Sequence, residues 1–204
     1  METSMSAGLE AWHGLVISAR MRVRRLEAGE ALFRQGEVVT ALYRLQGGRI
    51  RLIRCLEDGT AVVLHVARAG ETLAEASAFA DAYHCDAVAD VPSEVECLPK
   101  AELVAALASD GEARLGFTRL LAAQVRDLRA RAELQSIRSA PERVLAWLRM
   151  RATDNPPVAV LERTWTEVAA EIGLTREATY RALAKLEVDG RIVRQGSRVS
   201  LQAM

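Results

Sequence analysis

Five side chains that could bind nucleic acid lie within seven consecutive residues: Thr175, Arg176, Glu177, Tyr180 and Arg181. If this stretch is helical, Arg176 and Tyr180 share one face, as do Glu177 and Arg181. An arginine can donate two hydrogen bonds to guanine O6 and N7, a glutamate can accept one from cytosine N4, and a threonine hydroxyl suits a phosphate. This chemistry predicts contacts with double-stranded DNA. The alternative for a helix rich in arginine and glutamate is a solvated face held by salt bridges.

Two short helices joined by a glycine turn are expected to position these side chains. Thr164 and Glu167 have the Ser/Thr-x-x-Glu spacing of a capping box, which predicts the start of a first helix. Gly173 ends that helix, and Thr175 can cap a second one over residues 176–187. This is the helix-turn-helix pattern, and it favours DNA reading over the solvated face.

A β-hairpin is predicted directly after the second helix, over residues 190–201. Two β-branched runs flank a Gly196-Ser197 turn and carry Arg191, Arg194 and Arg198. The pattern is typical of the wing of a winged helix, whose arginines contact phosphates rather than read sequence. We therefore add Arg194 and Arg198 to the predicted DNA-binding residues.

Histidine and cysteine side chains in the first hundred residues could support a different chemistry. His65, His84, Cys85 and Cys97 offer imidazole and thiolate groups, which suit copper, zinc or haem iron, or a redox site. The alternative, which we favour, is that Cys55 and Cys97 are small buried apolar residues and His84 is a loop residue. Three cysteines without a Cys-x-x-Cys pair argue against a disulfide framework.

One long helix is predicted over residues 111–138, a stretch that contains no proline and many alanines and arginines. Apolar residues recur along it at intervals of three and four, so that they form one stripe. The helix could pack on its own domain, or its stripe could pair with a second copy across a two-fold axis, which its length favours. The predicted dimer interface consists of Phe117, Leu121, Val125, Leu128 and Ala132.

The first hundred residues are predicted to form strands and turns. Glycines that include Gly47 and Gly48 mark places where the chain is expected to reverse or to adopt a positive φ angle, and residues 57–60 predict a hairpin turn. Such a series of short strands suggests a small β-barrel or jelly roll over about residues 15–100. The expected strands cover residues 31–34, 41–45, 49–56 and 61–66.

Charge is divided unevenly along this chain of 204 residues, although its net charge is zero. Residues 1–111 carry 11 Lys/Arg and 16 Asp/Glu, whereas residues 112–204 carry 16 and 11, so the second half is the one that attracts phosphate. No apolar run is long enough to cross a membrane, and no charged segment followed by an apolar one begins the chain. We therefore expect a cytoplasmic protein without a membrane partner.

Three stretches of the sequence resemble the CRP/FNR superfamily of transcription regulators. The Gly-Glu-x-Leu-Phe-x-x-Gly-Glu motif over residues 29–37, followed by Leu42-Tyr43 and Gly48-Arg-Ile50, is similar to that family's cyclic-nucleotide-binding-type β-roll. Residues 143–148 and 175–186 resemble the opening helix and the recognition helix of its DNA-binding domain. The resemblance covers nearly the whole chain, and the first motif is the most specific.

The resemblance implies an α+β fold in three parts: a β-roll (jelly roll) sensor domain over 1–110, a dimerisation helix over 111–138 and a winged helix-turn-helix over 139–204. It also implies a homodimer that binds a palindromic promoter site and contacts RNA polymerase. Arg176, Glu177 and Arg181 match the family's base-reading positions. Thr179 departs from the usual apolar residue at the contact between the two helices.

The effector pocket is where this sequence leaves the best-known family pattern. Members that bind cyclic AMP carry Gly-Glu-Leu and an Arg-Ser pair, whereas the matching residues here are Ala74-Glu75-Ala76 and Cys85-Asp86. With cysteine in place of that arginine, the cation that binds the cyclic phosphate is missing, and the aspartate adds a negative charge that repels it. Both differences argue against cyclic AMP. A cysteine cluster near the N-terminus, typical of iron-sulfur members, is also missing. The effector is therefore unknown, and the candidate pocket residues are Glu75, His84, Cys85 and Asp86.

An enzyme is the least favoured class of function for this sequence. The histidines are His13, His65 and His84, and no Ser/His/Asp or paired-carboxylate arrangement has a plausible spacing. The competing hypothesis is a cytoplasmic metal- or redox-sensing protein that uses the histidines and cysteines of the β-roll. Its winged helix would then serve as a protein–protein surface.

Overall fold

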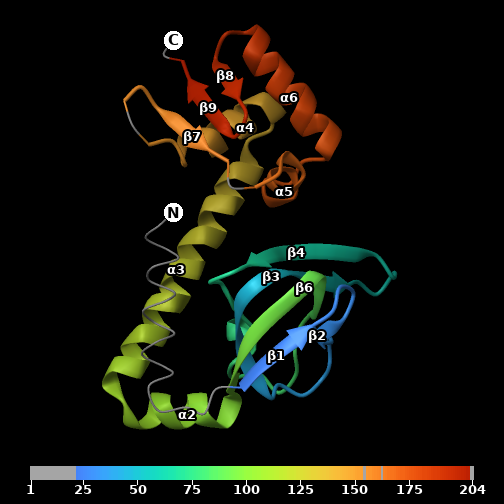
Figure 1. The fold of residues 1–204 in the computed structure, drawn as a ribbon, viewed down its shortest axis with the longest axis vertical. Helices are drawn as coiled ribbons and strands as arrows, with labels where there is room; N and C mark the ends of the chain where they lie inside the picture. Colours follow the sequence, from blue (N-terminus) through green and yellow to red (C-terminus); the bar gives the residue numbers. More distant parts are fainter. Residues whose placement is uncertain (1–21, 154, 162, 203–204) are drawn as a thin grey trace. The chain divides into compact units, whose positions relative to one another are not determined.

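The computed structural model describes residues 22–153, 155–161 and 163–202, so His13 lies outside the described residues. The chain forms two compact units that divide between Gln124 and Val125 (Figure 1). The α+β fold class predicted from the sequence is confirmed, with a β-sheet domain in the first unit and helices with a small sheet in the second.

The first unit is built on one six-stranded sheet of antiparallel pairs. Strands pair in the order β1-β6-β3-β4, while β2 pairs with β6 and β5 pairs with β3. A short 3₁₀ helix, η1, lies between β5 and β6. The elements are β1 (Arg22–Leu26), β2 (Ala31–Phe33), β3 (Ala41–Cys55), β4 (Ala61–Arg68), β5 (Thr72–Leu73), η1 (Glu75–Ser77) and β6 (Asp86–Pro99).

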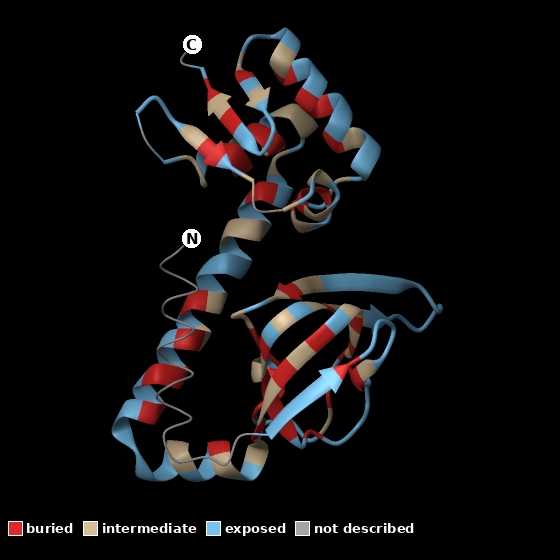
Figure 2. Cartoon of the chain, viewed as in Figure 1, coloured by how far each residue is buried: buried red, intermediate tan, exposed pale blue. Residues whose placement is uncertain are grey.

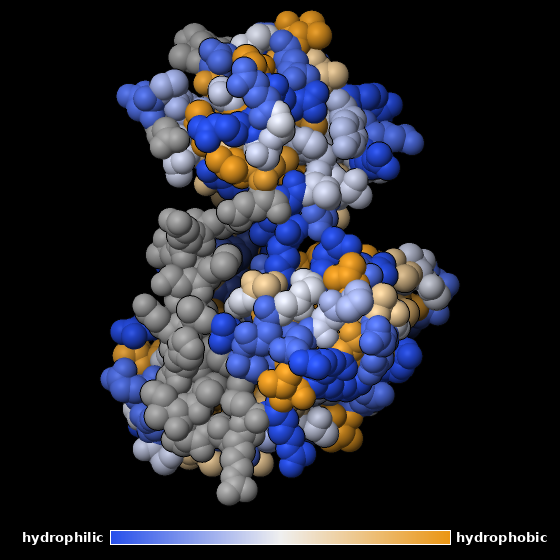
Figure 3. All heavy atoms as spheres, in the orientation of Figure 1, coloured by the Kyte–Doolittle hydropathy of each residue, from blue (hydrophilic) through white to orange (hydrophobic). Residues whose placement is uncertain are grey.

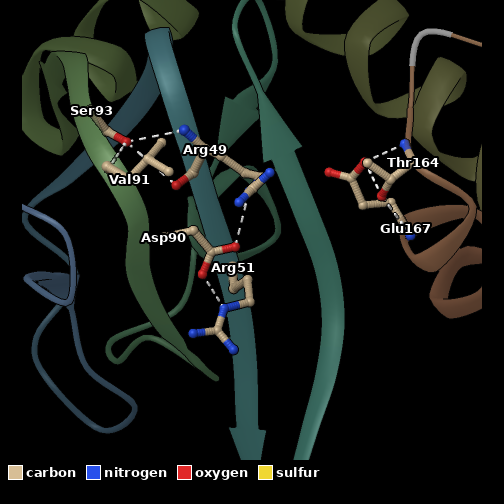
Figure 4. A network of polar contacts seen from close by, with 7 residues as sticks. All are labelled: Arg49, Arg51, Asp90, Val91, Ser93, Thr164 and Glu167. Carbon is tan, nitrogen blue, oxygen red and sulfur yellow. Dashed lines mark hydrogen bonds and ion pairs between the residues drawn. The ribbon is translucent and has the colours of Figure 1, made fainter. Parts of the chain in front are cut away.

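Strand β3 runs through Gly47 and Gly48, so the chain does not reverse there, and of the two expected alternatives the positive φ is the one found, at Gly48. Register irregularities occur there, and Gly48 has φ +91°. A Cβ on Gly48 would collide with Oγ of Ser93 on β6. That hydroxyl accepts the Arg49 N–H at 3.1 Å and donates to the Val91 carbonyl at 2.7 Å (Figure 4). The glycine therefore allows a close approach of two paired strands rather than a turn.

The hairpin turn predicted at residues 57–60 is confirmed between β3 and β4. The Leu56 N–H donates to the Thr60 carbonyl at 2.9 Å, and the Asp58 carboxylate accepts the Thr60 N–H at 2.9 Å. Buried residues of β3 and β6 form the core of the sheet, among them Leu45, Ile50 and Val95 at 0% exposure. Figure 2 shows buried segments along both strands.

Two helices follow the sheet, α2 (Lys100–Ser109) and α3 (Gly111–Ser136), close to the predicted long helix. The two halves of α3 belong to different cores. Ala113, Phe117 and Leu120 are buried in a cluster with residues of the first unit, whereas Leu134 is buried in the core of the second. The helix is therefore shared between the two units.

The second unit combines three helices with a three-stranded sheet in the order β7-β9-β8. The Ser139 side chain caps α4, and Trp147 and Leu148 of that helix enter the core. Strand β7 was not predicted and pairs with β9. The elements are α4 (Ala140–Arg149), β7 (Val158–Val160), α5 (Trp165–Glu171), α6 (Arg176–Val188), β8 (Ile192–Gln195) and β9 (Arg198–Leu201).

Hydrophilic side chains predominate on the face of the molecule seen in Figure 3, with hydrophobic ones between them. In the described part of the chain, no helix is both long and apolar enough to span a membrane.

Candidate functional site

The predicted capping box at the start of α5 is confirmed. Thr164 Oγ1 accepts the Glu167 N–H at 3.3 Å, and the Glu167 carboxylate accepts the Thr164 N–H at 2.7 Å (Figure 4). Two N–H groups that the first helical turn leaves without partners are satisfied in this way. The box fixes where the first helix of the pair begins.

The turn between α5 and α6 depends on a left-handed glycine, as predicted. Gly173 has φ +67°, and the N–H of the following Leu174 returns to the Ala169 carbonyl at 2.9 Å. Thr175 then caps α6 by accepting the Ala178 N–H at 3.1 Å. The predicted helix-turn-helix is therefore present in its full local detail.

Thr179 packs inside the helix pair despite its hydroxyl. Its side chain is fully buried, and Oγ1 donates to the Thr175 carbonyl at 3.1 Å. The polar atom is satisfied within its own helix, so the methyl group can face the apolar core. This departure from the family pattern thus leaves no buried hydroxyl unsatisfied.

The outward face of α6 presents the side chains predicted to read DNA. Arg176, Glu177, Tyr180 and Arg181 are all exposed, and Thr175 lies exposed at the helix start. The Arg176 guanidinium lies 5.7 Å from the centre of the Tyr180 ring, a cation–π contact that orients it along the helix. Hydrogen-bond donors and acceptors therefore stand together on one rigid, capped element.

The predicted wing is confirmed as the β8–β9 hairpin, but its arginines differ in their surroundings. The Arg194 guanidinium forms two hydrogen bonds with the Glu187 carboxylate of α6, at 2.8 and 2.6 Å. This pair lowers the pKa of Glu187 and occupies one edge of the guanidinium, so Arg194 fastens the wing to α6 in the free protein. Arg191 likewise pairs with Glu142 of α4. Arg198 is exposed and faces solvent.

A buried ion-pair cluster beneath α5 was not found from the sequence. The Glu171 carboxylate binds Arg151 at 2.5 Å and Arg163 at 2.8 Å. The Arg151 guanidinium lies 4.2 Å from the centre of the Trp147 ring, and burial lowers the pKa of this arginine. The cluster connects the end of α5 to the segments on either side of β7. Its residues are distant in sequence, so no short sequence motif predicts it.

The apolar stripe of α3 is exposed only along its second half. Leu128 is 61% exposed, Val125 is 45% exposed and Ala132 is also exposed, whereas Leu121 is partly buried. The prediction that Phe117 belongs to the dimer interface needs correction. Its side chain is 4% exposed and packs in the core of its own unit.

An exposed aromatic ring beside Phe117 was missed in the sequence. Phe79 is 71% exposed and meets the Phe117 ring edge to face, with the ring centres 6.1 Å apart. Its position in a loop carries no helical or strand periodicity, so no sequence signal identified it.

The candidate effector pocket lies around η1. Ala74, which precedes η1, has φ +69° and is the one non-glycine among the described residues with a positive φ. Gln124 of α3 donates to Oε1 of Glu75, while Oε2 of Glu75 is buried without a hydrogen-bond partner. His84 Nδ1 lies 2.9 Å from the Ser77 hydroxyl.

Cys85 and Asp86 differ in their surroundings. Cys85 is 1% exposed and belongs to the strand core, and both burial and the neighbouring Asp86 raise the pKa of its thiol. The Asp86 carboxylate accepts the Gln35 N–H at 2.7 Å. An inward thiol and a carboxylate bonded to the backbone therefore stand at the two positions that the family resemblance matches to the Arg-Ser pair.

The four predicted metal ligands do not gather at one place. His65 pairs with the Glu71 carboxylate at 2.6 Å, His84 contacts Ser77, and Cys97 is half-buried on β6. Within the described ranges, no three His, Cys, Asp or Glu residues lie close enough together to hold a metal ion. The sequence could not separate these residues in space, because their spacing along the strands leaves the register open.

Glu75 gives a pH-dependent stability prediction. Burial and the charge of Glu71 raise the pKa of Glu75 from 4.5 to about 7. Because the folded state binds this proton more tightly than the unfolded state, the stabilisation is complete below pH 4.5 and is lost as the pH rises through about 7. The loss amounts to at most about 3 kcal/mol of unfolding free energy.

Urea unfolding of the wild type and of Glu75→Gln between pH 5 and pH 8 measures this loss. We expect Glu75→Gln to remove most of the decline, whereas Glu112→Gln, at an exposed carboxylate on α3, should keep it. Parallel pH curves for the wild type and Glu75→Gln would contradict the prediction.

Comparisons with known proteins agree with this architecture. Residues 23–110 match the family described as the cyclic nucleotide-binding domain. The transcriptional regulator LdrP of Thermus thermophilus is 30% identical over 186 residues, which cover 88% of this chain and 91% of that protein.

Solved structures extend the likeness to the whole fold. A CRP-family transcriptional regulator from Thermus thermophilus is 26% identical, with a TM-score of 0.58 and coverage of 88% of this chain and 92% of that one. FixK2 from Bradyrhizobium japonicum has a TM-score of 0.68 at 19% identity and covers 90% of this chain and 93% of its own. Together with the helix-turn-helix and the β-roll, these matches show that the chain belongs to the CRP/FNR family of transcriptional regulators.

Proposed function

We propose that this regulator acts as a homodimer that inserts two copies of α6 into successive major grooves of a palindromic promoter site. The observation that carries the proposal is the exposed face of Arg176, Glu177, Tyr180 and Arg181 on a helix capped at Thr175. Side chains on a rigid element lose little freedom when they meet base edges, which favours sequence-specific contacts. Arg198 on the wing would contact a phosphate.

The second half of α3 supports the homodimer. Val125, Leu128 and Ala132 form an exposed apolar stripe on a helix of 26 residues, and pairing with a second copy would remove it from water. A two-fold axis along this stripe would hold the two reading helices at a fixed separation. Half-sites would then lie about 34 Å apart, or one helical turn of DNA.

The roles of the β-roll and of RNA polymerase remain parts of this proposal. We assign residues 1–110 to a sensor domain, 111–138 to dimerisation and 139–204 to DNA binding, with RNA polymerase as the protein partner. The surroundings of Cys85 and Asp86 favour an effector other than cyclic AMP. We assign no catalytic reaction to the chain, in keeping with relatives that are transcriptional regulators.

Selection of genomic fragments by the purified protein tests the proposal. We expect enrichment of fragments that share an inverted repeat with half-site centres about 10 base pairs apart. The double variant Arg176→Ala/Arg181→Ala, which leaves the helix cap in place, should enrich no common sequence. Recovery of random fragments by both proteins, or binding of a single half-site by a monomer, would refute the proposal.

A further inference from the structure

Arg143 of α4 uses its guanidinium to join two segments that are distant in sequence. Nε and Nη2 donate to the Ile137 carbonyl at 2.9 and 2.6 Å, and Nη2 also donates to the Gln135 carbonyl at 3.0 Å. Nη1 donates to the carbonyls of Ile172 and Gly173, both at 3.1 Å. A guanidinium has five N–H groups, so these five contacts use its whole donor capacity.

The four acceptors lie where two helices end. Gln135 is in the last turn of α3, Ile137 follows that helix, and Ile172 and Gly173 follow α5. Carbonyls at a helix C-terminus have no partner within the helix and carry partial negative charge. One cation therefore satisfies the ends of both helices. Lysine has a single nitrogen with three donors, so it cannot reach both ends in this geometry.

A second contact reinforces this joint. A Cβ on Gly173 would lie 3.3 Å from the Gln135 side chain, so the turn packs directly on the end of α3. Leu134 of α3 and Ile172 are buried in the same core cluster. Thr175, the cap of α6, comes two residues after Gly173. The start of the reading helix is therefore held close to the end of α3.

We propose that Arg143 is a positioning residue that fixes the direction of α6 relative to the second half of α3, and so sets the spacing between the two reading helices of the dimer. This inference rests on the proposed function. When one copy of α6 is bound to DNA, the other copy meets its half-site on the same duplex at a high effective concentration only if its direction relative to the first is fixed. Loss of Arg143 should therefore weaken binding to two half-sites far more than binding to one.

Arg143→Lys tests this inference, with Arg149→Lys at an exposed position of the same helix as the matched control. Affinities are measured by fluorescence anisotropy for the selected palindrome, for versions with one base pair added or removed between half-sites, and for a single half-site. We expect Arg143→Lys to bind the palindrome about tenfold more weakly or worse, to discriminate less between spacings and to keep half-site affinity within about twofold. Arg149→Lys should match the wild type in its spacing preference.

Equal losses on the half-site and the palindrome would assign Arg143 a general structural role and overturn the inference, as would no loss on either. If Arg143→Lys unfolds well below the wild-type temperature, Gln135→Ala removes the side chain that packs on Gly173 without straining the turn, and it should give the same pattern.

Hydrogen exchange without DNA separates failure of this inference from failure of the proposed function. We expect faster exchange in Arg143→Lys at residues 134–138 and 172–175, with α4 and the wing unchanged. Unchanged exchange at those residues would overturn the inference, whereas a wild type that binds no specific DNA overturns only the proposed function.

Discussion

Leu128→Glu is expected to convert the protein to a monomer and to lower its affinity for palindromic DNA about a hundredfold or more. Leu128 is 61% exposed and lies with Val125 and Ala132 on one stripe of α3. In the proposed dimer, the substitution would place two like charges next to each other across the two-fold axis while removing apolar contact. Separation of the two reading helices then removes the avidity of a bivalent ligand, which is worth about a hundredfold or more.

Leu115→Glu is the matched control for this prediction. Leu115 is also an exposed leucine of α3, at 41%, but it lies about 110° around the helix from the stripe at about 3.6 residues per turn. Sedimentation velocity at micromolar concentration should find a monomer for Leu128→Glu and a dimer for Leu115→Glu. A stable dimer of Leu128→Glu with normal DNA affinity would place the dimer interface elsewhere.

Local signals explain why the helix-turn-helix could be predicted closely. The capping box of Thr164 and Glu167, the left-handed Gly173 and the Thr175 cap each depend on residues within four positions of one another. Such interactions are readable from spacing alone. The hairpin turn at Asp58-Gly59 is similar, because its conformation depends on two or three neighbouring residues.

The strands were predicted less well because partners distant in sequence decide them. Strand β6 (Asp86–Pro99) contains aspartate, glutamate, serine and proline, which are weak strand formers, yet it pairs with β1, β2 and β3. Gly47 and Gly48 resemble a turn, and only the approach of Ser93 explains why β3 continues through them. Periodicity alone cannot reveal that contact.

Parts of the candidate site depended on tertiary contacts in the same way. The helical stripe identified Leu128 and Val125 as interface residues, but it could not exclude Phe117 from the interface. Phe117 is buried in the first unit, in one cluster with Leu42 and Leu98. Arg194 has the composition of a wing residue, and only the fold reveals its pairing with Glu187. Arg143 looks like an ordinary helix arginine until the ends of α3 and α5 meet around it.

Arg181→Ala is expected to cost about 1 to 3 kcal/mol at one base pair of the operator, which is about fivefold to 150-fold in affinity. Arg181 is exposed on the outward face of α6, one turn after Glu177, where its fork can reach a guanine edge. Removing it deletes a base contact but leaves the Thr175 cap and the buried Thr179 in place. The loss should disappear when the base pair that it reads is replaced.

Arg198→Ala is the comparison that distinguishes recognition of a base pair from electrostatic attraction to phosphates. Arg198 is exposed on the wing, so its loss should weaken specific and random duplexes alike and reduce the slope of log affinity against log salt by about one. Titrations of both variants on operator and random duplexes, at several salt concentrations, distinguish the two roles. If Arg181→Ala behaved like Arg198→Ala on every duplex, α6 would be an electrostatic anchor, and sequence reading would have to come from other residues.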